Sequence, residues 1–196
     1  QGMPVVMFDR VTNDILCDKV IIDDQSAAYE AVQSLIDKGR KKIALVTTVD
    51  YVSVGKLRTD GYIKALLDNG ISFDENLIIK IEDIDTCEIT IGKLLEDKAI
   101  DAVFAVNELF AVTIIKTANK IGLNVPKDLA VIAFTDGMIS KYSTPTITTV
   151  SQNGIKMGNK SAKMLIERLE SEENEEDENY KTEIIETHLI ERESTN

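Results

Sequence analysis

Apolar residues along this chain alternate between short unbroken runs and stretches with a helical period. Residues 4–8 (PVVMF) form a continuous apolar run, which is typical of a strand buried in a parallel sheet. Beyond residue 24, apolar positions recur every three or four residues, which predicts a helix with Asp24 as its N-cap and Gly39 at its C-terminal end. The first forty residues therefore predict strands followed by a helix.

The same alternation continues to the end of the chain. We predict further strands at residues 19–22, 43–47, 77–81, 102–106, 129–134, 147–150 and 182–190, and further helices at 57–67, 89–95, 108–121 and 155–169. Strands separated by helices favour right-handed βαβ units and an α/β fold with a mainly parallel sheet. The number of elements is high for one sheet in a chain of this length, which favours two lobes joined by crossing strands.

Charge and cysteine content narrow the function classes. The formal net charge is −12, and the segment 170–179 (ESEENEEDEN) contains seven acidic residues and no basic one, which predicts a solvated acidic linker at 171–180. Since no segment is rich in Lys or Arg, a DNA-binding surface is not expected within this chain. Cys17 and Cys87 fit no metal or redox spacing, which favours free thiols in a reducing cytoplasm.

Signals for membranes, catalysis and cofactors are missing from the sequence. It has no secretory leader ahead of the first strand and no apolar run near the roughly 18 residues of a membrane span. It has no nucleotide-binding glycine loop and no G-x-S-x-G elbow, and the lone His188 falls in the last predicted strand. The pair Asp23-Asp24 could open a phosphoreceiver pocket, but its other residues are not recognisable. We therefore expect no catalysis, no metal and no cofactor.

Polar side chains follow nearly every predicted strand. In open parallel α/β sheets, ligands bind outside the carboxyl ends of the strands. The residues at these positions are Asp9, Arg10, Asp23, Asp24, Thr48, Asp50, Tyr51, Ser53, Asn107, Glu108, Thr135, Asp136, Gln152 and Asn153, with Arg58 near the start of a helix. Their mixture of donors and acceptors suits a polyhydroxylated or heterocyclic ligand. Polar loops also occur at these positions in any α/β protein, so both interpretations stay open.

Seven strings then occur in a fixed order: PVVMFDR, LIDKGRKKIALV, RTDGYIKALLDNGI, AVNELFAV, NVPKDLAVIAFTD, PTITTVSQNGIKMGNKSAKML and LIERES. The ordered set, which covers residues 4–194, resembles the LacI/GalR (lactose-repressor/galactose-repressor) family of bacterial transcription regulators. The resemblance implies a periplasmic-binding-protein-like α/β fold, with parallel sheets flanked by helices in two lobes and a small effector in the cleft between them. It also implies a cytoplasmic homodimer that binds operator DNA through a helix-turn-helix head upstream.

The resemblance also implies which residues bind the effector. By matching motifs, the candidates are Asp9, Arg10, Arg58, Asn107, Thr135, Asp136 and Gln152. Two positions depart from the family pattern. Thr135 stands where many members have an effector-binding aspartate, so we expect a different ligand preference. Glu108 stands where the family has the aspartate of an N-D pair, which a helix N-terminus should tolerate.

The lobes implied by the resemblance are unequal. Residues 24–150 and 181–196 would form the C-terminal lobe, and residues 1–23 and 151–175 would be what remains of an incomplete N-terminal lobe. We expect a fragment without its DNA-binding head, whose dimer surface lies near residues 110–117 and 138–145. The expected effector is a sugar or sugar derivative, although a nucleobase is an alternative. A periplasmic sugar-binding protein of a transport system is the main alternative function, followed by an α/β-class enzyme.

Overall fold

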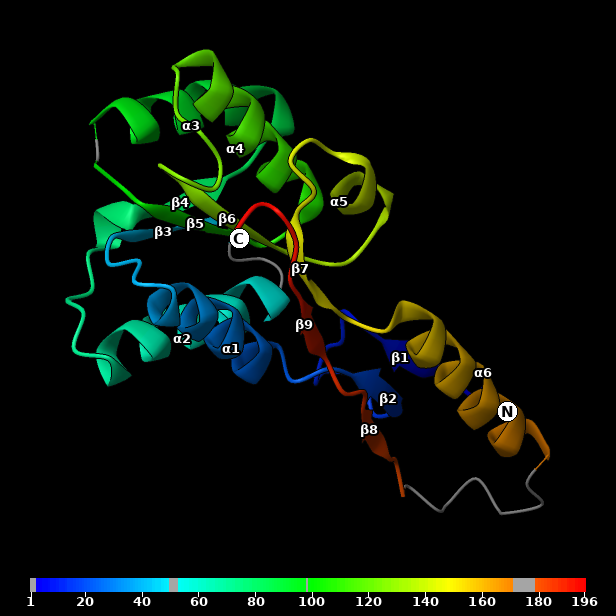
Figure 1. The fold of residues 1–196 in the computed structure, drawn as a ribbon. Coiled ribbons are helices and arrows are strands. Elements are labelled where there is room, and N and C mark those ends of the chain that lie inside the picture. Colours follow the sequence, from blue (N-terminus) through cyan, green and yellow to red (C-terminus); the bar gives the residue numbers. More distant parts are fainter. Residues whose placement is uncertain (1–2, 50–52, 98, 171–178) are drawn as a thin grey trace. The chain divides into compact units, whose positions relative to one another are not determined.

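The chain divides into two compact units, which are described separately (Figure 1). The computed structural model describes residues 3–49, 53–97, 99–170 and 179–196. Unit 1 comprises Gln1–Asp23 and Gln152–Thr187, and unit 2 comprises Asp24–Ser151 and His188–Asn196. The backbone therefore passes between the units three times, after residues 23, 151 and 187.

Unit 2 is built on a six-stranded sheet with the strand order β4-β3-β5-β6-β7-β9. Its strands are β3 (Ile43–Thr48), β4 (Ile78–Ile81), β5 (Ala102–Ala105), β6 (Ala130–Phe134), β7 (Thr148–Ser151) and β9 (His188–Ile190). All neighbouring pairs are parallel except β7 and β9, which are antiparallel. Every residue of β5 and β6 is buried, which explains their uninterrupted apolar sequences.

Helices cover both faces of this sheet. The helices α1 (Asp24–Asp37) and α2 (Ser53–Asp68) pack together on one face, and α3 (Ile84–Asp97) and α4 (Glu108–Lys120) pack together on the other (Figure 1). A short helix α5 (Met138–Tyr142) follows β6 and packs against α4, and a 3-10 turn (Glu75–Leu77) precedes β4. The predicted parallel sheet flanked by helices is confirmed, although α5 was not predicted.

Unit 1 contains a parallel three-stranded sheet with the order β1-β2-β8. Its strands are β1 (Val6–Phe8), β2 (Asp18–Ile21) and β8 (Thr182–Ile184), and the long helix α6 (Gly154–Glu170) packs against β1 and β2. Asp18, which opens β2, accepts hydrogen bonds from Arg168 Nε at 2.5 Å and Arg168 Nη2 at 2.9 Å. It also accepts one from the backbone N–H of Lys181 at 2.7 Å. These bonds join the start of β2 to the end of α6 and the residue before β8.

The prediction of one strand over residues 182–190 is wrong. The structure has two strands there, β8 in the sheet of unit 1 and β9 in the sheet of unit 2. The N–H of Ile185 still bonds to the carbonyl of Ile21 at 2.7 Å, after which the chain leaves unit 1. Residues 181–187 thus belong to unit 1, whereas the sequence assigned them to the C-terminal lobe. The sequence of residues 182–190, TEIIETHLI, has no Gly, Pro or Asn between the two strands and so does not reveal the change of sheet.

Three general expectations can be compared with the described residues. Both cysteines are buried free thiols, and burial raises the pKa of Cys87 to about 11. Among the residues that the structure describes, we find no cluster of three His, Cys, Asp or Glu side chains that could hold a metal ion. None of the described helices is both long and apolar enough to cross a membrane. The predicted acidic linker lies outside the described residues at positions 171–178.

Candidate functional site

Arg58 is held by three groups from separate segments of unit 2. It lies in α2 with its side chain 8% exposed, and its Nε donates to Asp24 Oδ1 at 2.7 Å. Its Nη1 donates to the carbonyl of Val106 at 2.9 Å, and its guanidinium carbon lies 3.6 Å from the ring centroid of Phe134. The arginine is therefore oriented by a carboxylate, a carbonyl and an aromatic face. Such an arrangement fixes a planar donor group in one orientation.

The rest of the R-x-x-G-Y motif has a packing role. A Cβ on Gly61 would overlap with the carbonyl oxygen of Gln25 in α1 and approach the Cβ of Ala28 to 2.9 Å. Only glycine at this position lets α1 and α2 pack this closely. Tyr62 is fully buried and donates its hydroxyl hydrogen to the carbonyl of Ile43 at 2.8 Å, and burial raises the pKa of this phenol. The motif therefore joins α1, α2 and β3 and fixes the backbone from which Arg58 projects.

Three candidates in unit 2 meet at the carboxyl ends of β5 and β6. Arg58 bonds to the residue before Asn107 and stacks on the residue before Thr135, so these side chains originate at one edge of the sheet. Asn107 is the N-cap of α4, and its Oδ1 accepts the N–H of Phe110 at 2.8 Å. Since the cap uses the amide oxygen, the bond leaves the NH2 end of Asn107 as a separate donor group.

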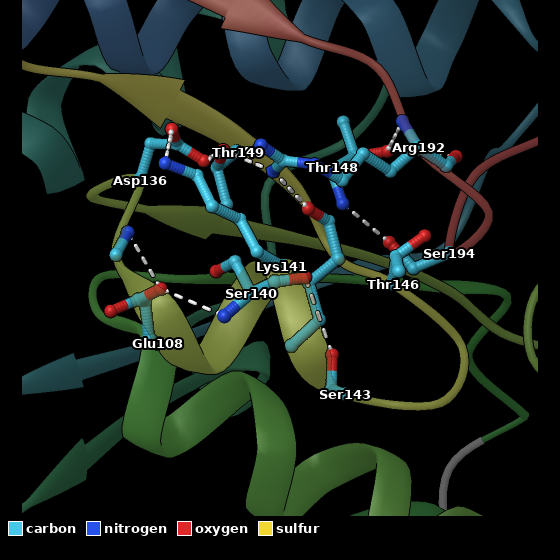
Figure 2. Close-up of polar contacts among 12 residues, drawn as sticks. Glu108, Asp136, Ser140, Lys141, Ser143, Thr146, Thr148, Thr149, Arg192 and Ser194 are labelled. Carbon is cyan, nitrogen blue, oxygen red and sulfur yellow. Dashed lines mark hydrogen bonds and ion pairs between the residues drawn. The ribbon is translucent and has the colours of Figure 1, made fainter.

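Glu108, next to this cap, connects α4 to α5 (Figure 2). Its Oε1 accepts the backbone N–H of Gly137 at 2.8 Å and that of Ser140 at 2.9 Å. A Cβ on Gly137 would overlap with the Glu108 carboxylate, so a side chain there is incompatible with this contact. The extra methylene that distinguishes glutamate from the expected aspartate thus carries the carboxylate into contact with the start of α5.

Asp136 lies at the centre of a polar cluster that includes the end of the chain (Figure 2). Its Oδ1 accepts from Arg192 Nη2 at 2.6 Å and from Thr149 Oγ1 at 3.0 Å, and its Oδ2 lies 3.2 Å from Lys141 Nζ. Burial acts to raise the pKa of Asp136, but hydrogen bonds from Arg192, Thr149 and Lys141 outweigh it, so the pKa is lowered. Asp136 is therefore a charged anchor in the structure, and its effector-binding role stays a prediction.

The residues after β9, which sequence reasoning gave no role, hold β6 and β7 in place. Arg192 Nη1 donates to the carbonyl of Ile147 at 2.7 Å, and Ser194 Oγ donates to the carbonyl of Val131 at 2.6 Å. The N–H of Thr148 donates to Ser194 Oγ at 2.8 Å (Figure 2). The signal in the sequence was the string LIERES, whose arginine and serine make these bonds. This string indicated the resemblance to the family but did not predict these hydrogen bonds.

The remaining candidates belong to unit 1. Asp9 follows β1 with a positive φ of 60°, and Gln152 Nε2 donates to its Oδ1 at 3.4 Å. Arg10 Nε lies 4.0 Å from Asp9 Oδ2, and the Arg10 side chain is 72% exposed. The structure therefore brings Asp9, Arg10 and Gln152 together within unit 1. Asp50 and Tyr51, also named from the sequence, lie outside the described residues, as does the side chain of Ser53.

Comparisons with known proteins identify the family of this chain. The family model of the periplasmic binding protein-like domain matches residues 32–195. The HTH-type transcriptional regulator MalR of Clostridium butyricum is 39% identical over 177 residues, covering 88% of this chain and 51% of MalR. The HTH-type transcriptional regulator CelR of Thermobifida fusca is 31% identical over 177 residues, covering 89% of this chain and 51% of CelR. The chain thus spans about half the length of the curated relatives it matches.

Solved structures give the same result. A complex of the transcriptional regulator CelR with cellobiose superposes with a TM-score of 0.87 at 30% identity, over 96% of this chain and 58% of that one. A LacI family transcriptional regulator from Enterococcus faecium with bound ribose gives a TM-score of 0.88 at 26% identity, over 98% of this chain and 70% of that one. The expected periplasmic-binding-protein-like fold and the resemblance to LacI-type regulators are both confirmed.

Proposed function

This chain belongs to the periplasmic binding protein-like domain family and, within it, to the LacI/GalR regulators, and on that premise we propose that it is the effector-sensing part of a ligand-responsive bacterial transcription regulator. The observation that carries the proposal is the edge of unit 2 where Arg58, Asn107 and Thr135 originate together. A buried ion pair with Asp24 fixes the arginine there. A site assembled in this way binds a ligand through preorganised hydrogen bonds.

The ligand of this site is an uncharged sugar or sugar derivative. Asp24 compensates the charge of Arg58, and Asp136 is paired with two cations, Arg192 and Lys141. The compensated charge of Arg58 favours a neutral ligand with hydroxyl groups, since a phosphate placed beside it would meet a guanidinium that is already paired with a carboxylate. Two relatives whose structures contain cellobiose and ribose support this ligand class.

The proposed regulator acts in the cytoplasm without catalysis, and its operator is bound by a part of the protein other than these residues. The net charge of −12 supports this division, because DNA binding requires clustered basic side chains. A homodimer forms through α4, α5 and the residues that follow α5. Leu109, Met138 and Tyr142 support this surface, since they are 46%, 74% and 80% exposed.

A transport protein that binds sugar outside the cytoplasm is the second candidate, because it would share the fold. Curated relatives with the names of transcriptional regulators favour the first candidate. The two candidates share a sugar site, so ligand binding alone does not separate them. A gain or loss of operator binding on addition of the sugar, measured with the intact protein, would favour the regulator.

The sugar site is tested by calorimetric titration of the full chain with cellobiose, ribose and their phosphorylated forms. We expect a neutral sugar to bind and its phosphate ester to bind at least about tenfold more weakly, because the phosphate loses its hydration beside a guanidinium that Asp24 already compensates. Asn107→Asp keeps the helix cap but removes the amide donor, so it should weaken binding while leaving thermal stability nearly unchanged. Equal binding by Asn107→Asp would contradict the proposed site.

A further inference from the structure

Residues 135–142, between β6 and the end of α5, combine two features that cost free energy. Thr135 has a φ of 78°, in the left-handed region that a β-branched residue rarely adopts. Ser140 is fully buried, and its hydroxyl has no hydrogen-bond partner among the residues that the structure describes. A buried hydroxyl without a partner destabilises the conformation that buries it. Both costs fall within one stretch of eight residues.

Two carboxylates hold this stretch in its strained conformation (Figure 2). Glu108 accepts the backbone N–H groups of Gly137 and Ser140 at 2.8 and 2.9 Å. Asp136 is bound by Arg192 at 2.6 Å. These contacts come from α4 and from the end of the chain, so the rest of unit 2 imposes the strained backbone and the sequence of the stretch itself does not favour it.

Little apolar burial anchors the stretch. Helix α5 has only five residues, and its Met138, Ile139 and Tyr142 are 74%, 40% and 80% exposed. Within one copy of the chain, a displacement of α5 would therefore expose little additional apolar surface. The main loss would be polar: the hydrogen bonds of Gly137 and Ser140 to Glu108, and the bond from the Ile147 N–H to the Ser140 carbonyl at 2.9 Å. Segments with few buried contacts are those that open locally at low free energy.

We propose that residues 135–142 form a segment with two positions. In the observed position, which is strained, Glu108 and Asp136 hold the segment in place. A ligand that contacts Thr135 shifts the segment to a second position, in which the strain at Thr135 and the burial of the Ser140 hydroxyl are relieved. The ligand part rests on the proposed function, because it places Thr135 at the effector site. A ligand shifts such an equilibrium only as far as it binds the two positions differently. The segment links the β6 end to the exposed residues of α5.

The stored strain is tested by hydrogen exchange of the ligand-free full chain, measured at single amides. Thr135→Asn replaces a residue that resists the left-handed backbone with one that tolerates it, and Ser140→Ala removes the hydroxyl without a partner. Each should slow exchange of the Gly137 amide about fivefold, because each stabilises the closed position. Gly137 is the informative amide, since Ser140→Ala alters the intrinsic exchange rate at residue 140 itself.

Matched variants give the opposite or no effect. Glu108→Gln weakens the acceptor for the Gly137 N–H and should speed its exchange. Ser161→Ala is the control for Ser140→Ala, because Ser161 is also buried in a helix but bonds to the carbonyl of Met157 at 2.9 Å. It should leave Gly137 exchange unchanged. Unchanged or faster exchange in both Thr135→Asn and Ser140→Ala would overturn the stored strain.

The link to a ligand is tested by repeating the exchange with cellobiose and with ribose at saturating concentration. A bound sugar should change the exchange rate of the Gly137 amide in the wild-type chain. The change should be smaller in Ser140→Ala, because this variant removes the buried hydroxyl whose cost favours the second position. Binding without any change at Gly137 would overturn the link. If neither sugar binds, the proposed effector class and the link both fail, while the ligand-free result still decides whether the segment is strained.

Discussion

Each unit contains a nearly buried aspartate paired with an arginine. The pair of unit 2 lies at the carboxyl ends of strands of its own sheet, whereas the pair of unit 1 lies at the amino end of a strand of its sheet. In unit 2, Arg58 bonds to Asp24 where β5 and β6 end. In unit 1, Arg168 bonds to Asp18, the first residue of β2. Ligands of open α/β sheets bind at the carboxyl ends of the strands. The same chemical pair is therefore suited to positioning a ligand in unit 2 and to joining secondary-structure elements in unit 1.

The partners of the two arginines reinforce this difference. Arg58 is 8% exposed and touches groups next to two candidate site residues, whereas Arg168 is 28% exposed and bonds to the carbonyl of Asn179 at 3.0 Å. Arg168 therefore joins the residues on either side of the acidic segment. Burial alone does not distinguish the pair at the proposed site from the structural pair in unit 1, whereas the position of each pair along the strands differs.

The largest effect is expected from Arg58→Ala. It removes the arginine that pairs with the Asp24 carboxylate, which is only 4% exposed, so it should lower the free energy of unfolding by about 3–5 kcal/mol and abolish sugar binding. Urea denaturation and calorimetric titration measure the two effects. The double variant Asp24→Leu/Arg58→Met should recover most of the stability but no binding. Recovery of binding in the double variant would mean that Arg58 has no part in the site.

A smaller effect is expected from Arg168→Ala. Two hydrogen bonds to Asp18 are lost, but Asp18 keeps its bond from the Lys181 N–H and Arg168 is partly exposed, so the cost should be about 2 kcal/mol. Sugar affinity should stay within about twofold of the wild type, since this pair lies at the amino end of β2. Titration of this variant beside Arg58→Ala tests the comparison directly. Equal loss of affinity in both would break it.

Two glycines extend the comparison to helix packing. Gly61→Ala in α2 places a methyl group against the backbone of α1 and should cost about 1–3 kcal/mol. Gly158→Ala in α6 is the matched control, because a Cβ there meets no heavy atom within 4 Å. It should stabilise the chain by about 0.5–1 kcal/mol through higher helix propensity. Thermal denaturation of both variants shows whether each substitution stabilises or destabilises the chain. Destabilisation by Gly158→Ala would contradict the open space around residue 158.

The smallest effect is expected on the stability of the fold at low pH. The hydrogen bonds from Arg168 lower the pKa of Asp18 against the opposing effect of burial, with the Lys181 N–H lowering it further. A carboxyl with a lowered folded pKa stabilises the fold above its unfolded pKa, near the ordinary value of 3.8, and this stability is lost as the pH falls through the folded value. Unfolding free energies between pH 5 and 2 should therefore fall less steeply in Asp18→Asn. An equally steep fall would contradict the shift.

Periodicity predicted most of the elements, because buried parallel strands are unbroken apolar runs and amphipathic helices repeat every 3.6 residues. It did not predict α5, which has only five residues and little apolar burial. It also joined β8 and β9, because residues 182–190 contain no Gly, Pro or Asn that would mark a break between strands of different sheets. The candidate residues of unit 2 were found from motifs and strand ends, but their contacts were not.

The sequence by itself determined the order of strands and helices, the parallel α/β class and the kinship with LacI/GalR regulators, since these follow from local patterns and ordered motifs. Only the tertiary structure decided the partners of the charged groups. Asp24 and Arg58 are 34 positions apart, and Asp136 and Arg192 are 56 apart. No local pattern relates residues so distant, because their pairing depends on how the sheet brings separate strand ends together. Those pairings determine which polar side chains anchor the fold.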